Sequence, residues 1–170
     1  MNNNIIFIGM MGCGKTTVSM ELSKVLPEFK LVDIDNEIEK STQKKISEIF
    51  LRHGEAFFRM LETEKIRYFC KQKSNQIISA GGGAFENEEN RKNMFDSGTV
   101  IYLKTSAEEI YKRIKNETHR PLLRNNFSVE KINEIMTKRE KNYKLADIIV
   151  DTTGKTPQNI IKEILGVINV

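Results

Sequence analysis

The fold is decided by residues 5–17, which read IIFIGMMGCGKTT. Residues 5–8 are β-branched or aromatic and continuously apolar, as in a strand that is buried on both faces of a parallel sheet. Residues 9–16 match the pattern G-x-x-x-x-G-K-[ST], and apolar side chains from Val18 onward recur at helical spacing. A strand, a glycine-rich loop and a helix in this order are typical of a site that binds nucleotide phosphates.

The residue types of this loop suit phosphate binding. Its glycines let successive backbone N–H groups curl around a β-phosphate, and the N-terminus of the following helix adds partial positive charge. Lys15 can reach the β- and γ-phosphate oxygens, and the Thr16 hydroxyl is placed to ligate Mg²⁺. A glycine-rich turn without nucleotide would not need the Lys-Thr pair in register. We therefore predict that nucleotide phosphates are bound by Gly12, Cys13, Gly14, Lys15, Thr16 and Thr17.

The composition is that of one globular domain. The chain has 170 residues, of which 39% are apolar and 29% charged, and this excludes collagenous, low-complexity and largely disordered chains. A net charge of +4 does not select among nucleotide, nucleic acid and acidic metabolite. Two cysteines are too few for a disulfide scaffold, and the apolar residues 5–8 are too few for a signal or membrane-spanning segment. We expect a cytoplasmic protein that does not enter a membrane.

Strand and helix signals alternate along the chain. Five short apolar runs are predicted strands: Ile5–Ile8, Leu31–Val32, Ile77–Ser79, Val100–Leu103 and Ile148–Val150. Apolar side chains at helical spacing lie between them, with a break at Gly54 and with Thr156 and Pro157 as the cap and first residue of the last helix. This alternation predicts an α/β fold with a parallel sheet and helices on both faces. Residues 36–61 and 115–127 fit this alternation poorly, and such excursions are usually lids or substrate-binding insertions.

Two aspartates follow the second predicted strand, at the edge of the sheet where α/β proteins bind ligands. If the strand continues, alternation points Asp33 and Asp35 to the same side. One carboxylate can then hold Mg²⁺ through water while the other accepts a hydrogen bond from an acceptor hydroxyl. The alternative is that Asp35 only caps a helix that begins at Asn36, and the residues alone leave both interpretations open.

Several later residues are candidates for the second substrate. Arg59 leaves the apolar face of its predicted helix, so it is either free to point into a cleft or solvated. Gly81–Gly83 follow the third strand and allow close approach of a ligand to the backbone, or else form only a flexible turn. Arg120 lies in a polar, basic stretch, and Arg139 precedes Glu140 on a predicted helix.

The order of these elements resembles that of the shikimate kinase family. The resemblance is carried by Gly9–Thr17, Asp33–Asp35, Gly54–Arg59, Gly81–Gly83, Arg120–Leu123 and Arg139–Tyr143. It extends over essentially the whole chain. The triple glycine and the Phe-Arg element are much more specific than the phosphate-binding loop.

The resemblance implies the P-loop NTPase fold of the nucleoside monophosphate kinase type, with a five-stranded parallel sheet flanked by helices. The single domain, residues 1–170, would then consist of a core at residues 1–32, 62–111 and 128–170, a shikimate-binding insertion at about 33–61 and a lid at about 112–127. The implied reaction, with Mg²⁺, transfers the γ-phosphoryl group of ATP to the 3-hydroxyl of shikimate in the chorismate pathway to aromatic amino acids. Its products are shikimate 3-phosphate and ADP.

The resemblance also implies roles for individual residues. Lys15, Asp35 and Arg120 would be catalytic, with Asp35 as candidate base and Arg120 on the ATP phosphates. Arg113 and Pro157 would sandwich the adenine. Metal binding would involve Thr16 and, through water, Asp33. Arg59 and Arg139 would clamp the shikimate carboxylate, and the acceptor-binding set would be Asp35, Arg59, Gly81, Gly82, Gly83 and Arg139.

Three other functions fit these residues less well than this resemblance does. Gluconate kinases and nucleoside monophosphate kinases share the loop and an arginine-bearing lid, but no second-substrate pattern here matches theirs. A nucleotide-binding regulatory homologue would be expected to lack Lys15, Asp35 or Arg59, and all three are present. Basic residues are dispersed among acidic ones, so we expect no nucleic-acid partner. Since no exposed apolar stripe is obvious, we expect a monomer.

Overall fold

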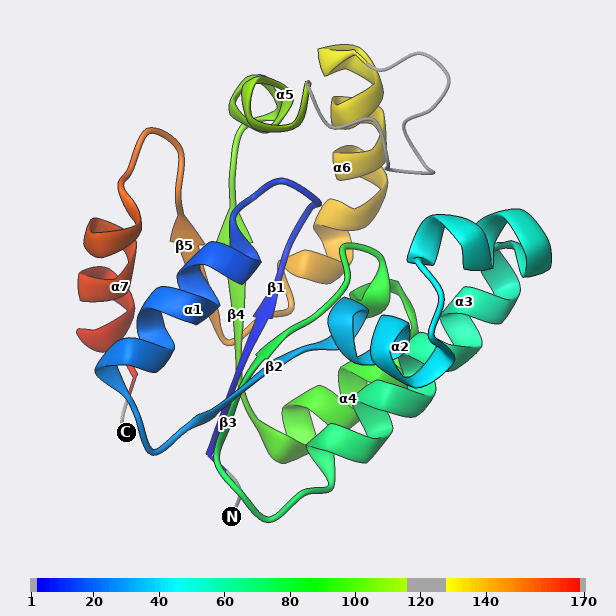
Figure 1. The fold of residues 1–170 in the computed structure, drawn as a ribbon. Helices are drawn as coiled ribbons and strands as arrows, with labels where there is room; N and C mark the ends of the chain where they lie inside the picture. Colours follow the sequence, from blue (N-terminus) through cyan, green and yellow to red (C-terminus); the bar gives the residue numbers. More distant parts are fainter. Residues whose placement is uncertain (1–2, 116–127, 169–170) are drawn as a thin grey trace.

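The computed structural model describes residues 3–115 and 128–168. Five strands form one sheet whose neighbouring strands are all parallel, in the order β2-β3-β1-β4-β5, and helices cover both faces (Figure 1). The predicted α/β fold and its five strands are therefore confirmed. The strands are β1 Asn4–Ile8, β2 Lys30–Asp33, β3 Gln76–Ser79, β4 Gly98–Lys104 and β5 Ile148–Asp151.

Helices connect these strands and follow them. They are α1 Lys15–Val25, α2 Ile34–Thr42, α3 Ile46–Cys70, the 3-10 turn η1 Ala84–Glu86, α4 Glu88–Ser97, α5 Ala107–Ile114, α6 Val129–Tyr143 and α7 Pro157–Leu165. Thr156 caps α7 with its side chain, and Pro157 occupies the first turn, where its missing N–H is not needed. The sequence predicted this start of α7 correctly.

Alternation along the central strand β1 creates two apolar layers. Ile5 and Phe7 face one side and pack with α1 and α7, through side chains such as Leu22 and Ile164. Ile6 and Ile8 face the other side and pack with side chains from α2, α3 and α4. Because both faces of the strand are buried, its sequence is continuously apolar instead of alternating.

The stretch that fits the alternation poorly forms α2 and the first part of α3. The break predicted at Gly54 is confirmed: this residue has φ 80° and ψ 174° and divides α3 into two parts. Both parts pack against the core, through Ile49 before the break and Phe58 after it, and the part before the break also lies beside α2 (Figure 1). The kink therefore lets one helix contribute both to the core and to the region beside the sheet edge.

The sequence predicts a protein that does not enter a membrane and a monomer without an exposed apolar stripe. No helix among residues 3–115 and 128–168 is both long and apolar enough to cross a membrane. The expectation of a monomer rested on the lack of an exposed apolar stripe. On α3, however, Leu51, Met60 and Tyr68 are all more than half exposed. Single exposed apolar side chains are normal on a protein surface, so the monomer stays a prediction.

Candidate active site

Two cavities adjoin at the carboxyl edge of the sheet. The first, of about 450 Å³, lies over the phosphate-binding loop and is called here the loop pocket. The second, of about 550 Å³, lies between the glycine-rich turn after β3 and the start of α3, and is called here the α3 pocket. Both are lined by Met11, Asp35, Gly81 and Gly82. The shared wall means that the two pockets are direct neighbours.

The phosphate-binding loop has the backbone that its glycines predict. Gly12 and Gly14 have φ of 77° and 101°, a left-handed conformation that other residues rarely adopt. Lys15 begins α1, and its Nζ donates to the carbonyls of Gly9 at 2.9 Å and Met10 at 3.1 Å. These two hydrogen bonds hold the ammonium group within the loop, beside the N-terminus of α1. Five of the six predicted loop residues line the loop pocket: Gly12, Gly14, Lys15, Thr16 and Thr17.

Cys13 is the exception among the predicted loop residues. Its side chain is buried in the core, and it does not line the loop pocket. Its carbonyl accepts a hydrogen bond from Arg113 Nη1 at 3.1 Å. Arg113 itself lines the loop pocket, so the predicted adenine-binding arginine lies at this site. Pro157 does not line either pocket, and Arg120 lies outside the described residues.

Asp33 and Thr16 offer oxygen atoms to a divalent cation. The Thr16 hydroxyl donates to Asp33 Oδ2 at 3.0 Å, across the end of β2. Within residues 3–115 and 128–168, no group of three or more His, Cys, Asp or Glu side chains could hold a metal ion. The hydroxyl and carboxylate oxygens nevertheless fit Mg²⁺, which commonly takes one or two protein ligands and completes its shell with phosphate and water oxygens.

The structure corrects the alternative proposed for Asp35. α2 begins at Ile34 and not at Asn36, and its capping residue is Asp33, whose Oδ1 accepts from the Asn36 N–H at 3.1 Å. The capping interpretation of Asp35 is therefore wrong. The condition of the alternation argument, that the strand continues to Asp35, is not met, because β2 ends at Asp33 and Asp35 lies in the first turn of α2. From there the carboxyl group lines both pockets.

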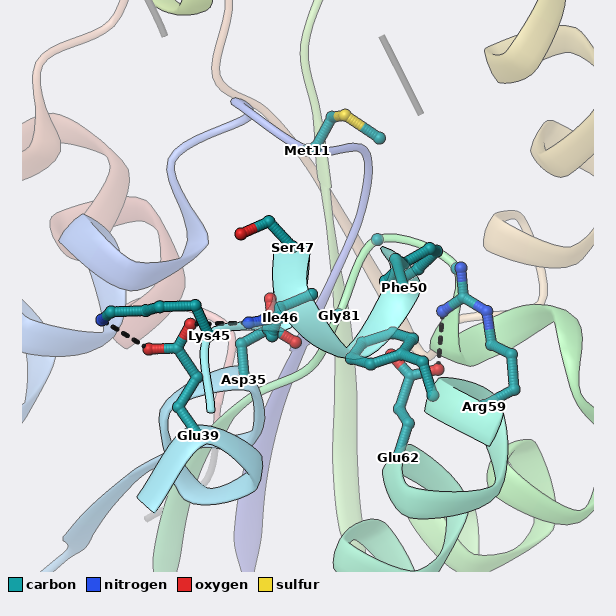
Figure 2. Close-up of a pocket in the computed structure, with 13 residues that line it drawn as sticks. Met11, Asp35, Glu39, Lys45, Ile46, Ser47, Phe50, Arg59, Glu62 and Gly81 are labelled. Atoms are coloured by element: carbon teal, nitrogen blue, oxygen red, sulfur yellow. Dashed lines mark hydrogen bonds and ion pairs between the residues drawn. The ribbon is translucent and has the colours of Figure 1, made fainter. Parts of the chain in front are cut away.

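Arg59 lies one turn beyond the kink in α3, with its guanidinium at the α3 pocket (Figure 2). Its Nη1 donates to Glu62 Oε2 at 2.7 Å, and its Nε and Nη2 donate to Glu55 Oε1 at 3.2 and 3.0 Å. Burial alone would lower the pKa of Arg59, but the two carboxylates outweigh burial and raise it. The predicted position of Arg59 in a cleft is confirmed, and the solvated alternative is wrong.

Glu62 is a site residue that the sequence analysis missed. Its side chain is fully buried, and Oε1 has no hydrogen-bond partner among the described residues. Burial raises the pKa of this carboxyl, although the neighbouring Arg59 acts to lower it. A signal was present, because Glu62 lies four residues from both Phe58 and Ile66 and so occupies an apolar position of the helix.

The triple glycine is explained by close approach to the site residues. A Cβ on Gly81 would overlap with Glu62 Oε1, and a Cβ on Gly83 would lie 2.6 Å from Arg59 Nη2. Both glycines therefore lie against charged side chains of α3, where there is no room for a Cβ atom. The interpretation of this segment as only a flexible turn is wrong, since any larger residue would displace those side chains.

The other side of the α3 pocket is held by an ion pair (Figure 2). Lys45, at the start of α3, does not cap the helix with its own side chain. Glu39 of α2 does so instead, accepting from the Ile46 N–H at 3.0 Å and from Lys45 Nζ at 2.8 Å. Burial acts to raise the pKa of Glu39, but these hydrogen bonds outweigh it and lower the pKa. The cap positions Ile46, which lines the pocket.

Arg139 and Tyr143 connect α6 to the glycine-rich turn. Arg139 Nη1 donates to the Gly82 carbonyl at 3.0 Å, and the Tyr143 hydroxyl donates to the same oxygen. Arg139 does not line either cavity, but it contacts the turn that separates them. The structure thus brings Arg139 to the glycine-rich turn, and its role toward a second substrate stays a prediction. The contact of Tyr143 with this turn was not foreseen.

The buried Glu62 predicts a pH dependence of stability. Because its pKa is raised above the ordinary value of 4.5, the folded chain holds a proton on this carboxyl more tightly than the unfolded chain does. The associated stability is fully present below pH 4.5 and is lost as the pH rises through the folded-state pKa. We expect the Tm of wild type, relative to that of Glu62→Gln, to be higher at about pH 5 than at about pH 7.

Thermal unfolding of the two proteins, without substrates, measures this difference. Glu55→Gln is the matched control, because it removes the exposed carboxylate that bonds to the same arginine. If the Tm difference between wild type and Glu62→Gln stayed constant over this pH range, the buried carboxyl would not be titrating as described.

A parallel sheet with a phosphate-binding loop, and a second charged pocket against that loop, defines a P-loop kinase of small molecules. The model of the family described as shikimate kinase matches residues 11–169. The chain belongs to the shikimate kinase family. It is therefore an ATP-dependent kinase, and the family predicted from the sequence is confirmed.

Relatives with the same description extend over nearly the full chain. Shikimate kinase from Persephonella marina is 46% identical over 163 residues, which cover 96% of this chain and 97% of that protein. Shikimate kinase from Thermodesulfovibrio yellowstonii is 41% identical over 162 residues, covering 95% of this chain and 92% of that protein.

Solved structures agree with the fold. Shikimate kinase from Acinetobacter baumannii, in complex with shikimate, superposes with a TM-score of 0.92 at 30% identity, covering 98% of this chain and 92% of that one. Shikimate kinase from Aquifex aeolicus gives a TM-score of 0.82 at 36% identity, covering 95% of this chain and 94% of that one.

Proposed function

We propose that the loop pocket binds ATP with Mg²⁺ and that the α3 pocket binds shikimate. The enzyme would then transfer the γ-phosphoryl group to the 3-hydroxyl of shikimate. The observation that carries this assignment is the shared wall of Met11, Asp35, Gly81 and Gly82. Phosphoryl transfer depends mainly on holding the two reactants in line and neutralising charge, and adjoining pockets provide the first of these conditions.

The α3 pocket suits a small acid that also carries hydroxyl groups. Arg59 presents a planar guanidinium held in place by two carboxylates, and Arg139 lies near the turn at Gly82. Two such forks match a carboxylate, which accepts paired hydrogen bonds. Phe50 and Phe58 belong to the apolar part of the lining, against which a carbon ring can pack. We therefore assign the carboxylate to Arg59 and Arg139, and the ring to the space above the two phenylalanines.

Asp35 is the residue that serves both substrates. It lines the two pockets, so its carboxylate can accept a hydrogen bond from the 3-hydroxyl and take its proton as the new P–O bond forms. Lys15 turns from the Gly9 and Met10 carbonyls to the β- and γ-phosphate oxygens. Thr16 and Asp33 would hold Mg²⁺, which supplies positive charge to the phosphates when it is bound.

The division of the domain follows from these assignments. α2 and the first part of α3 line the α3 pocket and lie outside the strand and helix alternation, as an acceptor-binding insertion at about residues 33–61 would. Arg59 and Glu62 add a contribution from beyond the kink, so the acceptor site extends into the part of α3 that packs on the core. A lid at about residues 112–127 lies almost entirely outside the described residues.

A coupled assay of ADP release tests the proposed function. We expect ADP release by the purified enzyme, with ATP and Mg²⁺, to depend on added shikimate and not on gluconate or AMP. The product should be identified as shikimate 3-phosphate by mass and phosphorus NMR. Release of ADP with gluconate or AMP as the preferred acceptor, or release without any acceptor at the same rate, would contradict the assignment of the α3 pocket.

A further inference from the structure

Two donors on α6 share one acceptor in the glycine-rich turn. Arg139 and Tyr143 are one helical turn apart, and both donate to the Gly82 carbonyl. Tyr143 is only 1% exposed and stacks on Tyr102, with ring centroids 4.8 Å apart. Burial raises the pKa of the Tyr143 hydroxyl, so this group stays protonated and acts as a donor at neutral pH. The packed ring leaves its hydroxyl little freedom to turn elsewhere.

The two donors, Arg139 and Tyr143, differ in the conformational freedom of their side chains. Arg139 carries five N–H groups on a flexible stem, and the proposed function assigns it to the acceptor carboxylate. Tyr143 has one hydroxyl on a rigid, buried ring and is not among the residues that line either pocket. If Arg139 alone held the Gly82 carbonyl, its movement toward a substrate would leave that oxygen without a partner. The hydrogen bonds to this carbonyl are partly buried, so loss of both partners would cost free energy.

From this geometry we infer that Tyr143 is a positioning residue for acceptor binding. Its hydroxyl holds the Gly82 carbonyl, so that Arg139 can engage the acceptor without disrupting the turn that lines the α3 pocket. The inference rests on the proposed function, because it requires an anionic acceptor that recruits Arg139. It adds a residue that does not itself contact the substrate.

The orientation of the turn supports this role. No cis peptide bonds occur in the described part of the chain, so the Gly82 carbonyl and the Gly83 N–H point in opposite directions from one peptide plane. Fixing the carbonyl toward α6 therefore fixes the Gly83 N–H away from α6. A Cβ on Gly83 would contact the Arg59 guanidinium, so the position of this peptide also determines the space available to Arg59.

Tyr143→Phe tests the inference, and Tyr102→Phe is its matched control. Each change removes one hydroxyl from the same stacked pair, but the Tyr102 hydroxyl donates to Glu140 Oε2 at 3.0 Å and not to the turn. We expect Tyr143→Phe to raise the KM for shikimate about tenfold, with the KM for ATP unchanged. Tyr102→Phe should leave both constants near those of wild type. Equal effects of the two variants, or a loss confined to ATP, would overturn the inference.

A double-variant cycle separates positioning from a general loss of packing. If Tyr143 acts through Arg139, then adding Tyr143→Phe to Arg139→Ala should not raise the KM for shikimate any further. Additive effects on this KM would overturn the inference. If the double variant does not fold, the comparison of the two single variants decides the question. The assay also distinguishes the two hypotheses. Absence of shikimate-dependent activity in wild type refutes the proposed function. Shikimate-dependent activity in wild type, together with an unchanged KM for shikimate in Tyr143→Phe, refutes only the role of Tyr143.

Discussion

Lys15→Ala is expected to abolish turnover while the chain still folds. The Lys15 ammonium lies at the N-terminus of α1, where the carbonyls of Gly9 and Met10 hold it within the phosphate-binding loop. No other lysine lines the loop pocket among the described residues. Without this charge the developing negative charge on the transferred phosphoryl group loses its partner in the loop. We expect kcat to fall by roughly 10³-fold or more, toward background.

Lys24→Ala is the matched control for this prediction. It removes a lysine from the same helix, but one that is exposed and pairs with Glu21 at the surface. Such a substitution should change neither kcat nor Tm appreciably. Circular dichroism and thermal unfolding would show whether Lys15→Ala is folded. A folded Lys15→Ala enzyme with near-normal kcat would refute the role assigned to Lys15.

Asp35→Asn is expected to lower kcat by about 10²-fold or more with little change in Tm. Asparagine keeps the size of the side chain and most of its hydrogen-bonding capacity but cannot take a proton from the acceptor hydroxyl. Stability should be preserved because the cap of α2 is supplied by Asp33. Steady-state kinetics and thermal unfolding on the same preparation measure both quantities.

The control for Asp35→Asn is Glu37→Gln. This variant also removes a negative charge from the first turn of α2, but the Glu37 side chain pairs with Lys40 at the surface and does not line the two pockets. Its kcat should match that of wild type. A preserved kcat in Asp35→Asn would refute the role of Asp35 in proton transfer. A fall in kcat of the same size in Glu37→Gln would indicate a general effect of charge at this helix terminus.

The sequence was most informative where one stretch of chain determines its own structure. The strand of residues 5–8 is apolar on both faces, and the glycines and Lys-Thr pair after it leave few alternatives for the loop. The kink at Gly54 and the start of α7 at Thr156 and Pro157 were also predicted correctly, because glycine and proline restrict the local backbone. In each case the deciding residues are neighbours in the sequence.

The sequence was less informative where distant segments meet. The contacts between α6 and the glycine-rich turn join Arg139 and Tyr143 to Gly82 across 57 and 61 positions of the chain. No local spacing predicts such a pair. The start of α2 was misplaced because an Asp-x-Asp stretch fits both a strand end and a helix cap. Glu62 was overlooked since a glutamate on a helix is usually solvated, although its position on the apolar face indicated burial.

The shared wall between the two pockets has a thermodynamic consequence. A ligand that shifts Met11, Asp35, Gly81 or Gly82 changes the lining of the neighbouring pocket as well. Whatever factor nucleotide applies to the Kd of the acceptor, the acceptor must apply to the Kd of the nucleotide, because both describe one coupling free energy. Because these four residues line both pockets, a substitution that changes this coupling changes both affinities by the same factor. Selection for tighter nucleotide binding at these positions would act on the acceptor at the same time.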